Sequence, residues 1–142
     1  MFDIEILRTN RAAVEEMLKK RSTEAPLDRI LDLDRRRIEL VRTVNVLREE
    51  RNRLSEEIKG LKDAAKRNEL IERTRGIRDR ISSVETELAT VEKDLRDLII
   101  WMPNMLAPEV PFGEDESGNV VVRTWGEPRQ FSFQPKDHVA IG

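Results

Sequence analysis

Cysteine and tyrosine are absent from this 142-residue sequence, and aromatic residues make up only 4% of it. The absence of thiols excludes disulfide bonds, thiolate metal sites and a cysteine nucleophile. Hydrophobic and charged residues each account for 38%, which leaves little apolar volume to fill a compact core. The composition is therefore typical of an elongated helical protein.

Long apolar runs are also missing. The longest, Leu-Ile-Ile-Trp-Met at 98–102, has five residues, whereas a membrane-spanning helix needs about 20. The amino terminus, Met-Phe-Asp-Ile-Glu, lacks the basic and then apolar pattern of a signal peptide. We therefore expect a cytoplasmic location and no membrane contact.

Proline is absent from residues 27–102, and glycine occurs there only twice. Apolar side chains recur there at alternating spacings of three and four over residues 27–102. A period of 3.5 held over several heptads is typical of helices wound around a partner. Because a charged break divides the repeat, we predict an all-α fold, a long antiparallel two-helix coiled-coil hairpin. Its core positions are Ile30, Leu33, Arg37, Leu40, Val44, Leu47, Arg51, Leu54, Ile58 and Leu61, then Leu70, Thr74, Ile77, Ile81, Val84, Leu88, Val91, Leu95, Leu98 and Met102.

The repeat leaves two registers open for this hairpin. Core residues that face each other have numbers that add up to either 128 or 135. We prefer 135, because it pairs Ile58 with Ile77 and puts Gly60 and Gly76 at nearly the same height. Each glycine costs a helix interior about 1 kcal/mol relative to alanine. The two glycines predict a loosely held tip, although Gly60 is also suited to ending the first helix.

Arginine occupies two core positions, Arg37 and Arg51, where a buried charge is costly. We expect the aliphatic stems to cover the seam between the helices. The guanidinium groups should reach the edge of the seam, near acidic residues such as Asp94 or Glu85.

Residues 3–20 predict two short helices. Ile4 and Leu7 share a face of the first, and Asn10 is suited to the N-cap of the second. The apolar stripe of the second helix consists of Val14, Met17 and Leu18. Helices this short are not stable alone, so we predict that they dock on the base of the hairpin. The apolar residues outside the seam there are Leu27, Leu31, Ile38, Val41, Ile99 and Ile100.

The last forty residues differ in character. Pro103 ends the helical pattern. Residues 103–142 hold five of the six prolines and four of the six glycines. Short strands are predicted at 120–125 and 130–133, as an extended or β-hairpin tail. We divide the chain into a helical arm at 1–103 and a linker with first strands at 104–142. Because a lone two-stranded hairpin is marginal in water, the tail should be mobile or pair with another copy in a dimer.

Charge is distributed unevenly along the hairpin. Residues 59–80 hold eight basic and four acidic side chains, whereas the remainder is net negative. A positive tip is suited to nucleic-acid phosphates, and the alternative is that the charges only keep exposed helix faces soluble. The candidate binding residues are Lys59, Lys62, Lys66, Arg67, Arg73, Arg75 and Arg78.

No catalytic motif accompanies this pattern. The sequence has no phosphate-cradling glycine loop, no HExxH and no nucleophile elbow. Its single histidine, His138, has no recognisable partner. We therefore expect no catalytic residue, metal or cofactor in this chain, and no activity from it alone.

Several segments resemble the amino-terminal part of seryl-tRNA synthetases. They are residues 1–8, Leu-Asp-Leu-Asp at 31–34, Leu-Arg-Glu-Glu-Arg-Asn-Arg-Leu-Ser at 47–55, Met-Pro-Asn at 102–104, and the segments 110–117, 119–129 and 135–139. The stretch at 119–129 followed by Asp-His-Val at 137–139 is specific, whereas heptads alone are not.

The resemblance implies that the hairpin grips a serine-specific tRNA across its long variable arm and elbow. It also implies a homodimeric class II enzyme that joins serine to tRNA with ATP and magnesium. The signature motifs of that catalytic domain would lie beyond Gly142, so 104–142 would lead into it.

The leading alternative is a structural or chaperone-like hairpin of the prefoldin type, which binds proteins through its tips. Such a tip should expose apolar residues, whereas residues 62–67 offer only Ala64 and Ala65.

Overall fold

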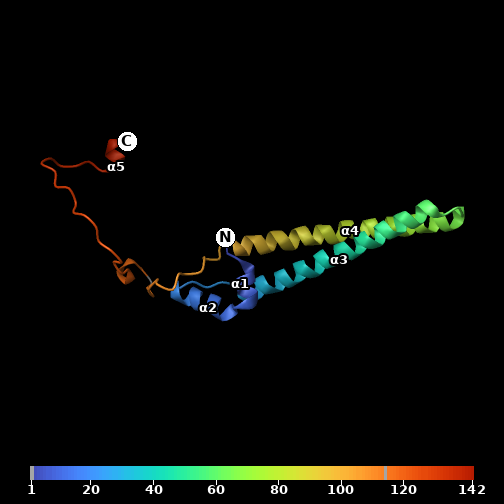
Figure 1. Cartoon of the computed structure of the whole chain (residues 1–142), viewed down its shortest axis with the longest axis horizontal. Helices are drawn as coiled ribbons and strands as arrows, with labels where there is room; N and C mark the ends of the chain where they lie inside the picture. The colour runs from blue at the N-terminus through green and yellow to red at the C-terminus, as the bar shows by residue number, and fades with distance from the viewer. Residues whose placement is uncertain (1, 114) are drawn as a thin grey trace. The chain divides into compact units, whose positions relative to one another are not determined.

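A computed structural model of the chain describes residues 2–113 and 115–142. They form two compact units, Met1–Val110 and Pro111–Gly142. The first unit contains α1 (Ile4–Thr9), α2 (Arg11–Lys20), α3 (Leu27–Gly60) and α4 (Ala64–Ile99). The predicted all-α hairpin is confirmed, because α3 and α4 run side by side in opposite directions (Figure 1). With 34 residues, α3 is about 50 Å long.

A three-residue turn joins the two long helices. α3 ends at Gly60, and the backbone N–H of Leu61 donates to the carbonyl of Ile58. The Asp63 carboxylate then caps α4 by accepting from the backbone N–H groups of Ala65, at 2.9 Å, and Lys66, at 3.3 Å. The chain therefore reverses at residues 61–63.

Three ion pairs between the long helices determine the register of the seam. They are Arg36–Glu87, Glu50–Arg73 and Arg48–Glu85. The residue numbers add up to 123 in each of the first two pairs and to 133 in the third. In an antiparallel seam, the sum of residue numbers is lower for pairs at one edge and higher for pairs at the other, and the core pairs have the mean of the two sums. The core pairs of this seam therefore add up to 128.

The preference for a sum of 135 is wrong, and the turn explains why. A sum of 135 would put the reversal of the chain between residues 67 and 68, inside α4. In the observed register Leu54 faces Thr74, and both are buried. The Thr74 hydroxyl donates to the carbonyl of Leu70 at 2.7 Å, so its burial leaves no hydroxyl proton unpaired.

The short amino-terminal helices dock on the base of the hairpin, as predicted. Asn10 caps α2 by accepting from the backbone N–H of Ala13. The resulting base cluster contains Leu7, Val14, Met17 and Leu18 from α1 and α2, together with Leu27, Ile30, Leu33, Leu40, Val91, Leu95 and Met102. A second cluster nearer the tip consists of Leu47, Leu54, Ile77 and Ile81.

The predicted docking surface needs correction at several positions. Ile38 and Val41 are half-buried but do not belong to the base cluster. Leu27, Leu31 and Ile99 contribute to the base cluster, but Ile100 is 65% exposed. α4 ends at Ile99, so the apolar stripe stops before Ile100.

The partners predicted for the seam arginines are also wrong. Arg37 donates to Asp34, at 3.3 Å, rather than to Asp94. Arg51 donates to Asn52, at 2.8 Å, because Glu85 is taken by Arg48. Both arginines pair within α3, where a neighbour one or three residues away is within reach without crossing the seam. Both are half-buried, as expected for stems that cover the seam.

The second unit contains a short 3-10 turn, Glu116–Gly118, and α5, His138–Ile141. The strands predicted at 120–125 and 130–133 are not formed, since the described residues of this unit have irregular backbone without strand pairing. A strand needs a partner for its backbone groups, and none of the described segments supplies one. Phe131 and Phe133 contact each other, with ring centroids 5.2 Å apart.

The boundary between the units lies after Val110, beyond the predicted end of the arm at Pro103. Met105 and Leu106 still pack on the base cluster, which explains the longer first unit. Among the described helices, none combines the length and the apolar character needed to cross a membrane.

Candidate nucleic-acid interface

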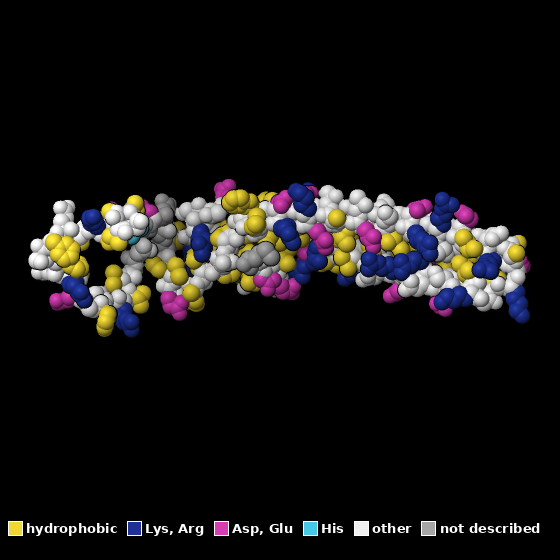
Figure 2. Space-filling model, turned by 90° about the horizontal axis from the view of Figure 1, so that it is seen from above, with side chains coloured by type: hydrophobic (Ala, Val, Ile, Leu, Met, Phe, Trp, Pro, Cys, Tyr) yellow, Lys and Arg dark blue, Asp and Glu magenta, His cyan; other side chains and the backbone are white. Residues whose placement is uncertain are grey.

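The seven candidate basic residues lie at the end of the hairpin opposite α1 and α2 (Figure 1). Lys59 lies in the last turn of α3 and Lys62 in the connecting turn, while the other five lie in the first half of α4. All seven are exposed. Figure 2 shows Lys and Arg side chains near this end, with apolar surface between them.

Two of the seven are already paired with carboxylates. Lys59 contacts Glu56 of its own helix at 2.6 Å. Arg73 contacts Glu50 across the seam, also at 2.6 Å, and so helps to hold α3 against α4. These two side chains are less available to an external anion than the rest.

The other five have no carboxylate within 4.0 Å in the described part of the chain. They are Lys62, Lys66, Arg67, Arg75 and Arg78. An exposed cation without an internal partner is the kind of group that neutralises nucleic-acid phosphates. The structure thus narrows the sequence-derived set from seven residues to five that are free to contact an anion.

One further exposed arginine of α4 lacks a carboxylate partner in the described structure but projects from a different face of the helix. Arg80 is exposed, lies on α4 and likewise has no carboxylate within 4.0 Å among the described residues. The sequence reasoning counted it in the positive segment but left it out of the candidates. It lies two residues from Arg78, about 200° around the helix, and therefore outside the group formed by Arg75 and Arg78.

A groove lies between the two helices near the tip. Its volume is about 470 Å³, and it is lined by Ser55, Ile58, Ile71, Glu72, Thr74, Arg75 and Arg78. Ile71 is 43% exposed, and Ile58 is half-buried. The groove therefore combines two cationic side chains and one carboxylate with two apolar side chains.

A larger hollow of about 690 Å³ lies at the base, between α2 and the start of α3. Three basic and three acidic side chains line it: Arg11, Lys19, Arg29, Glu15, Glu24 and Asp28. Arg11 is bound by both Glu15 and Asp28. Because these charges neutralise one another, the hollow is a poor site for an anion.

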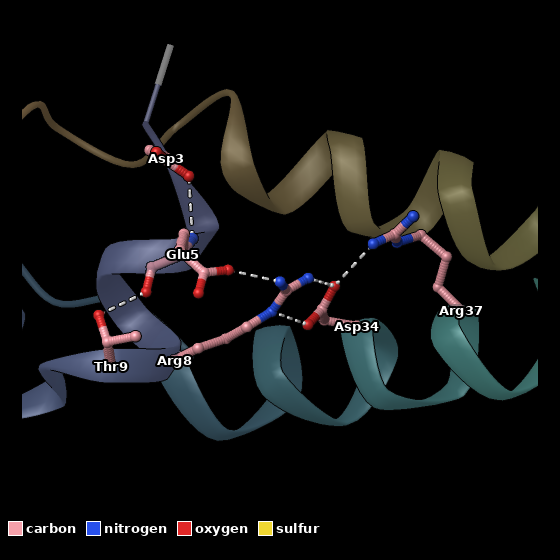
Figure 3. A network of polar contacts seen from close by, with 6 residues as sticks. All are labelled: Asp3, Glu5, Arg8, Thr9, Asp34 and Arg37. Carbon is pink, nitrogen blue, oxygen red and sulfur yellow. Dashed lines mark hydrogen bonds and ion pairs between the residues drawn. The ribbon is translucent and has the colours of Figure 1, made fainter.

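A polar network fixes α1 to α3 at the base (Figure 3). Arg8 donates from Nε and Nη2 to the two carboxylate oxygens of Asp34, at 2.6 and 2.7 Å. Arg37 donates to the same carboxylate, and Glu5 accepts from Nη1 of Arg8. The hydrogen bonds from Arg8 hold the pKa of Asp34 below its usual range, against the opposing effect of burial.

No group of three or more carboxylate or imidazole side chains in residues 2–113 and 115–142 is placed to hold a metal ion.

Comparisons with known proteins support the hairpin as a known type of domain. Residues 1–106 match the family described as the seryl-tRNA synthetase N-terminal domain. A serine–tRNA ligase of Thermomicrobium roseum is 46% identical over 97% of this chain and 31% of its own length. One of Carboxydothermus hydrogenoformans is 41% identical over 100% of this chain and 34% of its own length.

A solved structure agrees with these relatives. The seryl-tRNA synthetase from Pyrococcus horikoshii, complexed with ATP, superimposes with a TM-score of 0.74 at 34% identity, over 89% of this chain and 29% of that one. This chain spans about a third of the length of the curated relatives it matches. Since the family match covers the whole hairpin with α1 and α2, the chain belongs to the seryl-tRNA synthetase N-terminal domain family.

Proposed function

We propose that this chain is the tRNA-binding arm of a seryl-tRNA synthetase and that the tip of the hairpin contacts the phosphate backbone of a serine-specific tRNA. The observation that carries the proposal is the set of exposed basic side chains at the tip without internal carboxylate partners: Lys62, Lys66, Arg67, Arg75 and Arg78. Membership of the family supports it.

The architecture suits recognition by shape. A two-helix coiled coil about 50 Å long reaches far from its base, and the Arg8–Asp34 network fixes the base helices against it. Phosphate contacts position an RNA without reading its sequence, and double-stranded RNA is recognised mostly through shape and backbone. A long variable arm is the tRNA feature that such a lever would grip.

The activity of the longer protein is part of the same proposal. The relatives named above are serine–tRNA ligases, which supports a longer protein that joins serine to tRNA. We propose in addition that this protein is a cytoplasmic homodimer and uses ATP and magnesium. The arm would hold the tRNA for that reaction. This chain by itself should not activate serine, and serine-dependent pyrophosphate exchange by the purified chain would contradict this.

The prefoldin-like alternative is less well supported. Residues 62–67 are exposed and offer only Ala64 and Ala65 as apolar groups. Family membership also favours tRNA over a protein client.

The experiment that tests the proposal is a titration of serine tRNA, with and without its variable arm, at several salt concentrations. Replacing Lys62, Lys66 and Arg67 by glutamate should weaken binding and reduce the salt slope by about 2 to 3, since each phosphate contact adds about 0.7 to 0.9. The matched control replaces Lys19, Arg21 and Arg29, which are exposed at the base, and makes the same change in net charge. Equal loss of affinity in the two triple variants would refute a tip-located site.

A further inference from the structure

The groove near the tip differs from the rest of the charged surface in its polar groups. Arg75 and Arg78 lie three residues apart on α4, so their guanidinium groups project from the same face. Neither has a carboxylate within 4.0 Å in the described part of the chain. Guanidinium groups bind phosphate through paired hydrogen bonds and stack on nucleobases.

The other polar groups of the groove are acceptors. The Ser55 hydroxyl donates to the carbonyl of Arg51 at 2.8 Å, and the Thr74 hydroxyl donates to that of Leu70. Each hydroxyl proton is therefore used, which leaves oxygen lone pairs for a ligand. The Glu72 carboxylate also accepts, and it repels phosphate. Glu72 lies three residues before Arg75 and six before Arg78 on α4, so an anionic group would lie towards Arg78.

Two apolar side chains line the groove. Ile58 and the partly exposed Ile71 provide a surface on which a flat ring can lie. The volume of about 470 Å³ falls in the range of small-ligand sites, about 300 to 1,000 Å³. Cationic donors, acceptors and apolar side chains in one groove match the phosphate, the N–H and 2′-OH donors, and the base of one nucleotide.

The opposite edge of the seam lacks this combination. There Arg73 is bound to Glu50 across the helices. The hollow beside it is lined by Val46, Glu49, Glu50 and Arg53, and its two carboxylates would repel phosphate. An RNA that follows the tip is thus favoured on the side of Arg75 and Arg78.

We propose, on the basis of the function proposed above, that RNA lies against this face of the hairpin and that the groove receives a single unstacked nucleotide. Its phosphate contacts Arg75 and Arg78, its base lies on Ile71, and Glu72 accepts a hydrogen bond from its base or ribose. A nucleotide at a loop or bulge can leave its stack in this way, whereas one inside a duplex cannot do so without losing its base pair.

The first test compares Arg78→Ala with Arg80→Ala in the 142-residue chain, titrated with serine tRNA. The two arginines are both exposed and unpaired in the described structure, and they lie two residues apart, about 200° around the helix. Losing a charged contact to the RNA should weaken binding by about tenfold for Arg78→Ala, with a much smaller effect for Arg80→Ala. Equal effects would overturn the preference for one face.

The second test fills the groove without changing charge. Ser55→Phe should weaken binding by about tenfold and leave the salt slope unchanged, whereas Ser83→Phe, on an exposed part of α4 outside the groove, should bind like the unmodified chain. Ile71→Ser, at a partly exposed position, removes an apolar side chain of the groove and should also weaken binding. Ile71→Ser checks that a weaker affinity of Ser55→Phe is not caused by misfolding, because Ile71→Ser leaves the buried seam intact.

A set of serine tRNAs, each lacking one base, identifies the nucleotide. One abasic position should weaken binding to the unmodified chain but have no further effect on Ser55→Phe. If Ser55→Phe and Ile71→Ser bind normally, or if no abasic position shows this coupling, the nucleotide site is refuted. If Lys62, Lys66 and Arg67 matter while these variants do not, the proposed function stands and only the groove assignment fails. If the unmodified chain binds no tRNA, both fail.

Discussion

Arg8 of α1 holds the buried carboxylate of Asp34 on α3 through two parallel hydrogen bonds, 2.6 and 2.7 Å long. Asp34 is only 2% exposed, whereas the Arg8 side chain is 30% exposed. The pair is bidentate, the geometry in which arginine and carboxylate bind most strongly. It joins residues that are 26 positions apart and thereby determines how the first helix is attached to the arm.

Asp34→Asn should lower the free energy of unfolding by about 2 to 3 kcal/mol, because Arg8 and Arg37 lose their shared anionic partner. Urea denaturation followed by circular dichroism measures the change. The control is Asp28→Asn, which breaks the Arg11–Asp28 pair. Asp28 is 81% exposed, so this pair is an exposed counterpart of the buried one. The change in the free energy of unfolding should be much smaller for this control, because water and salt screen an exposed ion pair. Equal destabilisation by the two substitutions would contradict the importance of burial.

The contribution of Asp34 should depend on pH in one direction. Its pKa in the folded chain lies below the ordinary value of 3.8, chiefly because Arg8 donates hydrogen bonds to the ionised form. Above 3.8 the carboxyl is ionised in both folded and unfolded chains, so the stabilisation is fully present. As pH falls through the folded-state pKa, it is lost, because the unfolded state takes up its proton first.

The measurement is the stability difference between the unmodified chain and Asp34→Asn from neutral pH downwards. The difference should be constant above about pH 5 and shrink below about pH 4. Asp28 also has a lowered pKa, but it is present in both proteins, so its effect cancels. A difference that grew on acidification would contradict the assignment.

The heptad pattern was sufficient to predict the hairpin and most of its core residues. The apolar stripes of α1 and α2 predicted their docking on the base. Apolar residues at every third or fourth position determine which face of each helix is buried, because any other orientation would expose the entire apolar stripe. The register was not predicted correctly, because both alternatives bury similar side chains and differ only in the turn and in three ion pairs. The N-cap at Asp63 was the sequence signal that would have decided it.

The candidate site was predictable to a smaller extent. Clustering of basic residues is visible in the sequence, and the structure brings all seven candidates to the tip. Which of them are paired is not visible, because Arg73 meets Glu50 across the seam only in the observed register. The Arg8–Asp34 pair was missed for a similar reason, since it depends on how α1 docks.

Engineered cysteines test the register directly, since the natural sequence has none. Leu54→Cys with Thr74→Cys should form a disulfide under mild oxidation, because these positions face each other. Leu54→Cys with Ile81→Cys should not, since seven residues along α4 correspond to about 10 Å, beyond the span of a disulfide. Thiol titration and mobility under non-reducing conditions distinguish them, and efficient closure of the second pair would restore a sum of 135.

Gly76→Ala should raise the free energy of unfolding by about 0.5 to 1 kcal/mol, because glycine is unfavourable inside a helix. A Cβ at this position would meet nothing within 4 Å. Gly76 lies four residues from Arg80 and so on the same face of α4, away from the proposed RNA-binding face. Affinity for tRNA should therefore be unchanged. Thermal unfolding measures the first effect, with Gly60→Ala at the end of α3 as the smaller-effect control. A lower midpoint for Gly76→Ala would show strain that the structure does not contain.

Two truncations test where the arm ends. Every buried apolar residue in the described chain lies between Phe2 and Met102, and Met105 and Leu106 pack on the base cluster from outside it. Removing residues 111–142 should therefore leave the unfolding midpoint of the arm unchanged. Removing residues 104–142 should lower stability by about 1 to 3 kcal/mol, because two partly buried side chains lose their contacts with the base.

Light scattering on the same three proteins tests self-association. Val122 is 96% and Trp125 89% exposed in the second unit, and exposed apolar groups of this kind favour contact with another chain. Association of the full chain that disappears in both truncations would place it in residues 111–142. A dimer that survives both truncations would place self-association in the helices and contradict the expected role of the tail. In the unfolding experiment, equal midpoints for the two truncations would support the predicted end of the arm at Pro103.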